Sequence, residues 1–390
     1  MLEILLIKNR NYDTILSSKC TTKELKTSKR TEISTIKLPL LSFSIALIGV
    51  SLSMWGASWD ITSHLLRTPE TFFTPSHGVL YLGVGISLVS AILSLITLLT
   101  KRQMREKPFV FGLKLIITGA ILQVIAGPGD FYWHELFGID GLLSPTHLTL
   151  ALGIMIVSIG TVIGFGRIHS NLVEKNGFVK SVIPVSFGIF WFSVMWLIFF
   201  FVLPISEGDT HNFNPDPYVA IALGFVALPF AFSMVFWSAS KSLNIFGAAS
   251  ASTLTFLVMN ITSNIITSEN LLIYLPWFAA PMISSIIADY ILSKKVKSKL
   301  IQRHSEKISG IILGSMFFMF CFPMLSMTFL EFYLFNDVFP YDVLPTASST
   351  VAEIWMMTAI PGAVSGMLGM MFASRKLCGI SNDHTTKLEI

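Results

Sequence analysis

Long apolar stretches separated by short polar segments follow one another from residue 38 to residue 371. A helix of about 20 apolar residues matches the ~30 Å hydrocarbon core of a bilayer. Backbone amides within lipid must be paired inside a helix or a closed barrel, and these stretches lack the period-two alternation of barrel strands. The pattern therefore predicts an all-α, polytopic membrane bundle of about ten transmembrane helices. The expected spans are 38–58, 77–100, 109–126, 147–166, 181–203, 218–238, 243–264, 271–292, 309–332 and 346–371.

The composition agrees with a membrane protein. Of the 390 residues, 53% are hydrophobic and 13% are charged, whereas a soluble domain carries about 25% charged residues. The three cysteines form no C-x-x-C pair, so the sequence indicates neither a thiolate zinc site nor a disulfide framework. We expect the lipid bilayer, and no nucleic acid, among the partners of this chain.

Positive charge is sorted to one side of the predicted membrane. With ten spans, every Lys and Arg except Arg67 falls on the side of the N-terminus, while acidic residues such as Asp60 and Asp130 fall on the other side. The positive-inside rule then places both termini in the cytoplasm. The sequence thus predicts a multi-pass protein of the plasma membrane.

A motif of the form D-x3-H-x10-P-[ST]-H occurs twice, 70 residues apart and without a gap. Histidine is rare in this chain, with eight residues in all, and four of the eight fall at corresponding positions of the two copies. Chance is a poor explanation for such a register, so we interpret the motif as an internal repeat. The repeated ligand-type residues are Asp60, His64 and His77 in the first copy and Asp130, His134 and His147 in the second.

The repeat suggests a division of the chain into four parts. Residues 1–37 are expected to be a basic cytoplasmic tail, and residues 38–168 a duplicated region of two helical hairpins that carries the motif. Residues 181–371 are expected to form a six-helix membrane region, followed by a second cytoplasmic tail at 372–390.

Each copy of the motif spans the end of one helix and the start of the next, on the outer side. The Asp and the first His are four residues apart, so they share a helix face if the helix continues through them. A Thr or Ser followed by Pro then starts the returning helix, which places the second His near a helix N-terminus. The positive end of the helix dipole disfavours imidazolium there, and neutral imidazole is the form that ligates metal.

Carboxylate and imidazole groups at a bilayer are costly unless they are paired, hydrated or coordinated. We therefore expect these six residues to be metal ligands, either in one site per copy or in one shared site. Their chemistry suits copper, iron or zinc, and the affinity order of divalent metals favours copper. Two alternatives stay open: Asp–His hydrogen bonds that anchor each hairpin, and a proton or ion path.

The spacing D-x3-H-x12-H resembles the metal-ligand motif in the C subunit of the copper membrane monooxygenases, the particulate methane and ammonia monooxygenases. In that family one Asp and two His on adjacent transmembrane helices hold a copper implicated in oxidising small apolar substrates with O2. The resemblance implies copper ligation by the residues of each copy, and it covers only these two segments. Unlike the family, this chain carries the motif twice and has more spans.

Together these features predict an integral membrane metal-binding protein, acting as a copper-type oxidoreductase on a small molecule at the outer face. A small apolar substrate and membrane partner subunits are the further partners that this hypothesis implies. The alternatives are a metal-ion or proton transporter, which could use Asp289, Asn260 and Asn264 as polar steps, and a non-catalytic subunit of a membrane complex.

Overall fold

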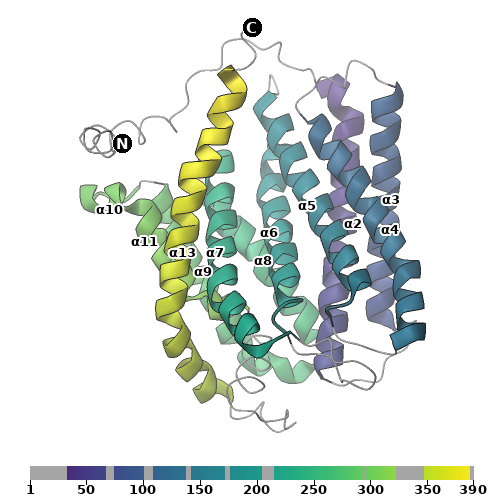
Figure 1. Ribbon diagram of the computed structural model, residues 1–390. Helices are drawn as coiled ribbons and strands as arrows, with labels where there is room; N and C mark the ends of the chain where they lie inside the picture. The colour runs from purple at the N-terminus through teal and green to yellow at the C-terminus, as the bar shows by residue number, and fades with distance from the viewer. Residues whose placement is uncertain are drawn as a thin grey trace, which may run out of the picture.

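The structure is a computed structural model that describes residues 33–66, 74–100, 109–137, 142–171, 176–203, 215–293, 295–321 and 347–386. All regular elements of these residues are helices, and they run up and down in one bundle (Figure 1). In chain order they are α2 (Ile33–Leu65), α3 (Pro75–Thr100), α4 (Val110–Phe137), α5 (Pro145–Asn171), α6 (Gly177–Phe199), α7 (Pro217–Leu243), α8 (Ala248–Ile265), the 3-10 helix η2 (Glu269–Tyr274), α9 (Leu275–Leu292), α10 (Lys299–Arg303), α11 (Ser305–Ser315), α12 (Phe317–Phe320) and α13 (Ala347–Thr386).

Within the described residues, eight helical segments are long and apolar enough to cross a membrane. The prediction of an all-α, polytopic membrane bundle is therefore confirmed. The eight segments are Ile36–His64, Pro75–Thr100, Val110–Phe137, Pro145–Ser170, Gly177–Phe199, Ala222–Leu243, Glu269–Leu292 and Trp355–Leu377.

Within the described residues, the two remaining expected spans, 243–264 and 309–332, contain no helix that meets the same length and apolarity. The first contains α8, whose 18 residues extend over about 27 Å and include buried Ser, Thr and Asn side chains that make it less apolar. The second begins in α11 and α12, and residues 322–332 lie outside the described part of the chain. Residues 1–32 and 387–390 of the two expected tails also lie outside it.

Several helices are longer than the hydrophobic pattern indicates. The span expected at 109–126 continues as α4 through Pro128 to Phe137, and the span expected at 38–58 starts at Ile33 and continues to Leu65. Proline costs a helix one backbone hydrogen bond but does not have to end it. These extensions keep the Asp and the first His of each motif copy within one continuous helix. The last helix, α13, likewise extends beyond residue 371 to Thr386.

Helices α2 to α5 form a four-helix unit of two hairpins. Helix α2 packs along α3, α4 packs along α5, and the hairpins meet through α3 with α4 and α2 with α5. Helix α6 joins this unit to the rest of the bundle through α5 and α8, and α13 packs against α7 and α11 (Figure 1). The motif-bearing hairpins thus form one side of the bundle.

The two hairpins are closed by glycine contacts that lie 70 residues apart. A Cβ added to Gly49 would come within 3.0 Å of the Gly83 carbonyl oxygen, and a Cβ added to Gly119 would come within 2.5 Å of the Gly153 carbonyl oxygen. Small residues let helix backbones approach closely in membranes, where packing rather than water exclusion drives association. Both hairpins therefore have backbones in direct contact at corresponding positions.

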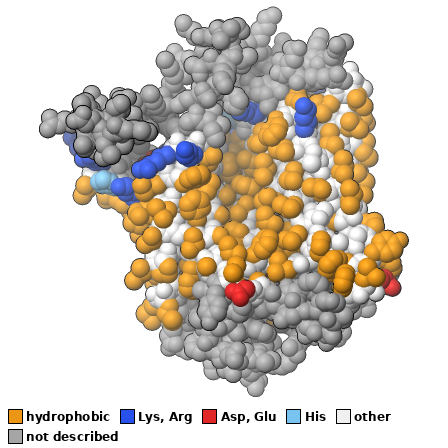
Figure 2. Space-filling model, viewed as in Figure 1, with side chains coloured by type: hydrophobic (Ala, Val, Ile, Leu, Met, Phe, Trp, Pro, Cys, Tyr) orange, Lys and Arg blue, Asp and Glu red, His pale blue; other side chains and the backbone are white. Residues whose placement is uncertain are grey.

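Charged side chains on the visible face lie at the two ends of the bundle. Figure 2 shows Lys and Arg side chains at the end that carries α10, Asp and Glu side chains at the opposite end, and a broad hydrophobic belt between them. A belt of this kind is the surface that a helical bundle presents to lipid.

Candidate metal centre

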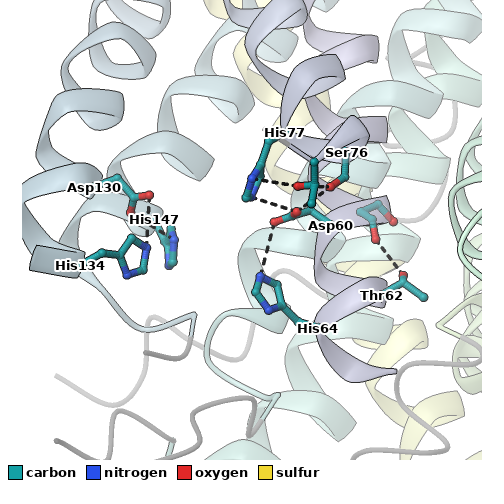
Figure 3. Close-up of polar contacts among 10 residues, drawn as sticks. Asp60, Thr62, His64, Ser76, His77, Asp130, His134 and His147 are labelled. Atoms are coloured by element: carbon teal, nitrogen blue, oxygen red, sulfur yellow. Dashed lines mark hydrogen bonds and ion pairs between the residues drawn. The ribbon is translucent and has the colours of Figure 1, made fainter. Parts of the chain in front are cut away.

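The first cluster lies where α2 ends and α3 begins. Asp60 and His64 are one turn apart on α2, and His77 is the third residue of α3. The carboxylate lies between the two imidazoles, with His77 Nε2 at 3.0 Å from Oδ1 and His64 Nε2 at 3.7 Å from Oδ2 (Figure 3). The close hairpin packing therefore brings the three residues of the first motif copy together.

Two hydroxyl groups at the start of α3 support this cluster. Ser76 Oγ donates a hydrogen bond of 2.8 Å to Asp60 Oδ1, so that oxygen faces both a hydroxyl and an imidazole. Thr74 Oγ1 lies 3.1 Å from His77 Nδ1, the ring nitrogen on the far side from the carboxylate. A partner at this second nitrogen fixes the tautomer and the orientation of an imidazole.

The second cluster lies at the corresponding place between α4 and α5. His134 Nε2 is 3.4 Å from Asp130 Oδ2, and His147 Nε2 is 3.2 Å from Asp130 Oδ1. One ligand-type atom from each of the three residues lies within 4.8 Å of the others. Among the described His, Cys, Asp and Glu residues, these three form a group that is close enough to hold one metal ion.

The hydroxyl groups at the start of α5 are arranged differently from those of α3. Thr146 Oγ1 donates to Asp130 Oδ1 at 2.8 Å, as Ser76 does in the first cluster. Ser144 Oγ accepts a hydrogen bond from the backbone N–H of His147 at 3.0 Å and lies 3.0 Å from Thr146 Oγ1. The Nδ1 atom of His147 is buried and has no hydrogen-bond partner in the described part of the chain.

The two His–Asp distances in the second cluster are compatible with ligands of one metal ion. Nitrogen and oxygen atoms bound to one metal at about 2.0–2.1 Å lie about 2.8–3.4 Å from one another in octahedral or tetrahedral geometry. Both His–Asp distances at Asp130 fall in this range, whereas the His64 distance in the first cluster is longer. A carboxylate can ligate through either or both oxygens, so Asp130, His134 and His147 could hold a metal ion.

Exposure and aromatic neighbours also distinguish the clusters. The Asp60 side chain is 13% exposed and that of Asp130 is 33% exposed, so the second carboxylate is more accessible to solutes. The His77 ring is stacked on Tyr81 with 5.9 Å between centroids, while Ala151 occupies the position 70 residues after Tyr81. In the second cluster the two imidazoles lie beside each other, with centroids 5.7 Å apart.

All six sequence-predicted ligands therefore lie in two clusters at the same end of the bundle (Figure 3). Ser76 and Thr146 occupy the Ser/Thr position of the repeated motif, for which the sequence predicted no role at the site. Their bonds to the carboxylates could have been anticipated, because each hydroxyl immediately precedes the second His of its copy.

The polar residues considered for a transport path make structural contacts. Asp289 Oδ2 accepts hydrogen bonds from the backbone N–H groups of Gly247 and Ser250, at 2.9 and 3.0 Å, and so caps the N-terminus of α8. Asn264 Nδ2 donates to the Asn260 backbone oxygen at 2.7 Å.

The same side of α8 contacts the motif-bearing helix α2. Thr62 Oγ1 donates to Asn264 Oδ1 at 3.1 Å, and Ser58 Oγ lies 2.8 Å from Ser263 Oγ. These buried hydrogen bonds hold helices together, as polar residues commonly do in membrane bundles.

No protein-family profile matches the sequence, and no curated protein or solved structure is significantly similar to it. The fold and the site therefore define the class on their own. The chain is a helical integral membrane protein with an Asp–His–His group that could hold a metal ion.

Proposed function

We propose that this protein is a membrane metalloprotein whose principal metal centre consists of Asp130, His134 and His147. The observation that carries the proposal is the convergence of one carboxylate and two imidazoles within 4.8 Å on two helices held together by glycine contacts. The corresponding residues Asp60, His64 and His77 are proposed as a second, weaker centre.

The main competing interpretation is a hydrogen-bonded anchor without metal. A charge-assisted N–H···O hydrogen bond is typically about 2.7–2.9 Å long. The Asp130 distances of 3.2 and 3.4 Å are longer than this, while the His77–Asp60 distance of 3.0 Å is close to it. Hydrogen bonding also fits the second cluster, where His134 bonds the Asp130 carboxylate. The convergence of all three side chains and the more even His–Asp distances are what favour metal ligation there.

We propose copper as the metal. Two imidazoles and one carboxylate suit copper, iron or zinc, and the same set is the facial triad of non-haem iron oxygenases, so iron is the nearest competitor. The affinity order among divalent ions and the resemblance to the copper membrane monooxygenases both favour copper. Bound copper would supply one-electron redox chemistry. In each cluster the chain would contribute one imidazole from the end of a helix, one imidazole from the start of the next helix, and a carboxylate that accepts a hydrogen bond from Ser76 or Thr146.

The proposed activity is an oxidoreductase reaction on a small molecule at the outer face of the plasma membrane. The sorting of Lys and Arg supports cytoplasmic termini, and the motifs lie at the opposite end of the helices. A small apolar substrate could reach this level of the bundle from the lipid.

Metal content of detergent-purified protein tests the proposal. We would compare the wild type with a His134→Ala/His147→Ala variant by mass spectrometry, after reconstitution with Cu, Fe or Zn and removal of loose metal. His304→Ala, at the junction of α10 and α11, is the control for loss of a histidine. The expected result is about one or two copper ions per chain in wild type and control and a clear loss in the double variant. Equal, negligible metal in all three proteins would contradict the proposal.

The transporter hypothesis is less well supported because Asp289, Asn260 and Asn264 form hydrogen bonds with other helices of the bundle. Proteoliposomes loaded with a metal-sensitive dye distinguish the two functions. A resident metal centre predicts stoichiometric binding without flux. Flux that His134→Ala/His147→Ala abolishes would favour transport instead. Co-purification of another membrane protein in constant ratio would favour the partner-subunit alternative.

A further inference from the structure

The segment between α9 and α11 carries an exposed basic surface at the end of the bundle opposite the metal motifs. Residues 295–307 contain five basic side chains, all exposed, and one acidic residue, Glu306. With His304 neutral, the segment has four net positive charges. We call this set the α10 basic surface, and its members are Lys295, Lys297, Lys299, Arg303 and Lys307.

An apolar side chain stands within this surface. Leu300 lies in α10 between the basic residues and is 69% exposed, which is among the largest exposures of a large hydrophobic residue in the described chain. In Figure 1, α10 projects sideways from the bundle at the end where α9 finishes. In a bilayer spanned by the bundle, α10 would lie near the boundary between headgroups and acyl chains. Short amphipathic segments bind there through both charge and apolar area.

The segment is held in a defined conformation by several contacts. Gln302 Nε2 donates to the Val296 backbone oxygen at 2.6 Å, and Tyr290 Oη donates to the Lys295 backbone oxygen at 3.3 Å. The Lys295 ammonium lies 4.9 Å from the centre of the Phe246 ring. The basic side chains are therefore displayed by a folded turn whose backbone is fixed to the bundle.

We propose that the α10 basic surface binds the headgroups of anionic phospholipids, with Leu300 inserted among the first acyl carbons. Clusters of Lys and Arg next to transmembrane helices attract anionic lipid, and the attraction falls off within a Debye length. The lipid faces the basic end of the bundle, which charge sorting assigns to the cytoplasmic leaflet. This inference does not depend on the metal centre.

Lipid retention tests the proposal with a charge-matched control. The full chain would be purified in micelles containing equal amounts of phosphatidylcholine and phosphatidylglycerol, and retained lipid measured by native mass spectrometry. Lys297→Gln/Lys299→Gln changes the proposed surface. Lys114→Gln/Lys180→Gln removes the same charge from exposed positions on α4 and α6. Because all four side chains are exposed, both variants should fold, and unchanged thermal unfolding in phosphatidylcholine would verify this.

The expected result is a loss of retained phosphatidylglycerol of about threefold or more in the Lys297/Lys299 variant and little change in the control. Leu300→Gln should also reduce retention, whereas adding soluble glycerol phosphate should not displace the lipid. Equal retention in the two double variants would overturn the proposal. Displacement by glycerol phosphate together with full retention in Leu300→Gln would also overturn it, since the surface would then be a simple anion site.

Discussion

The two motif-bearing hairpins contain the same three ligand types at the same spacing, and yet their clusters differ in geometry. At α2–α3, the shorter His–Asp distance is 3.0 Å, the longer is 3.7 Å, and the carboxylate is largely buried. At α4–α5, the distances are 3.2 and 3.4 Å and the carboxylate is one-third exposed. A repeated ligand pattern therefore does not guarantee two equal sites, because neighbouring side chains decide how closely the ligands converge.

The neighbours that differ are few. The hydroxyl residues occur in opposite order, Thr74 and Ser76 in the first copy and Ser144 and Thr146 in the second, and only the first copy provides a partner for Nδ1 of its second His. Tyr81 stacks on His77, whereas the corresponding residue is alanine. His77 is thus restrained on two sides and fits a hydrogen-bonded cluster.

The largest expected difference between the hairpins is in metal affinity. Removing His134 and His147 together should weaken binding of the first metal equivalent by at least ~100-fold, since changes outside the ligand set already cost ~10–100-fold. Removing His64 and His77 together should leave that equivalent bound. Titration of both double variants with Cu(II), monitored by the visible absorption of the bound ion, measures this difference in affinity. The reverse ranking would mean that the α2–α3 cluster is the principal centre.

In contrast, substitution of the packed glycines should reduce stability by a similar amount in both hairpins. Gly83→Val and Gly153→Val each push a side chain into the facing backbone, and overpacking of this kind typically costs about 1–3 kcal/mol. We expect similar falls in the thermal unfolding midpoint for the two variants. Gly85→Ala and Gly127→Ala are controls, because a Cβ at either position meets no atom within 4 Å. A fall in only one hairpin would show that the corresponding contacts are not equivalent.

Much of this architecture can be predicted from the sequence, because its signals lie in short stretches of the chain. The apolar stretches give the fold class and the approximate positions of most long helices, and the repeated Asp and His positions identify the residues that cluster. The continuation of α4 through Pro128 could not be predicted, because a Gly-Pro-Gly segment usually favours a break. The hydrogen bonds from the start of α8 to Asp289 could not be predicted from the sequence either. They join Asp289 to Gly247 and Ser250, which lie 42 and 39 positions earlier in the chain.

A smaller effect is expected from the hydroxyl that orients the carboxylate. Thr146→Val keeps the shape of the side chain but removes its hydrogen bond to Asp130, and should weaken metal binding by about tenfold. Ser76→Ala should change the affinity of the first equivalent much less, because Ser76 serves the other cluster. Isothermal titration of both variants provides the comparison, and equal losses would indicate a single shared site.

The smallest expected effect is an increase in metal affinity. Ser144→Thr copies the residue that faces Nδ1 in the first cluster, and should give His147 a hydrogen-bond acceptor. One hydrogen bond contributes about 0.5–1.5 kcal/mol, so metal affinity should rise by about two- to tenfold. The reciprocal Thr74→Ser should not raise it. An unchanged affinity in Ser144→Thr would show that the missing partner does not limit the second centre.

The glycine contacts within each hairpin affect how precisely the Asp and His side chains of two helices are placed relative to each other. Each centre takes ligands from two helices, so axial slippage by one residue would move His147 about 1.5 Å relative to Asp130. Metal sites tolerate only about 0.2 Å of error in ligand distance. Gly119 and Gly153, one residue on each of those helices, bring the two backbones into direct contact and so restrain such slippage. If the second cluster holds a metal, the close packing of Gly119 and Gly153 would help to fix the distance between Asp130 on one helix and His147 on the other.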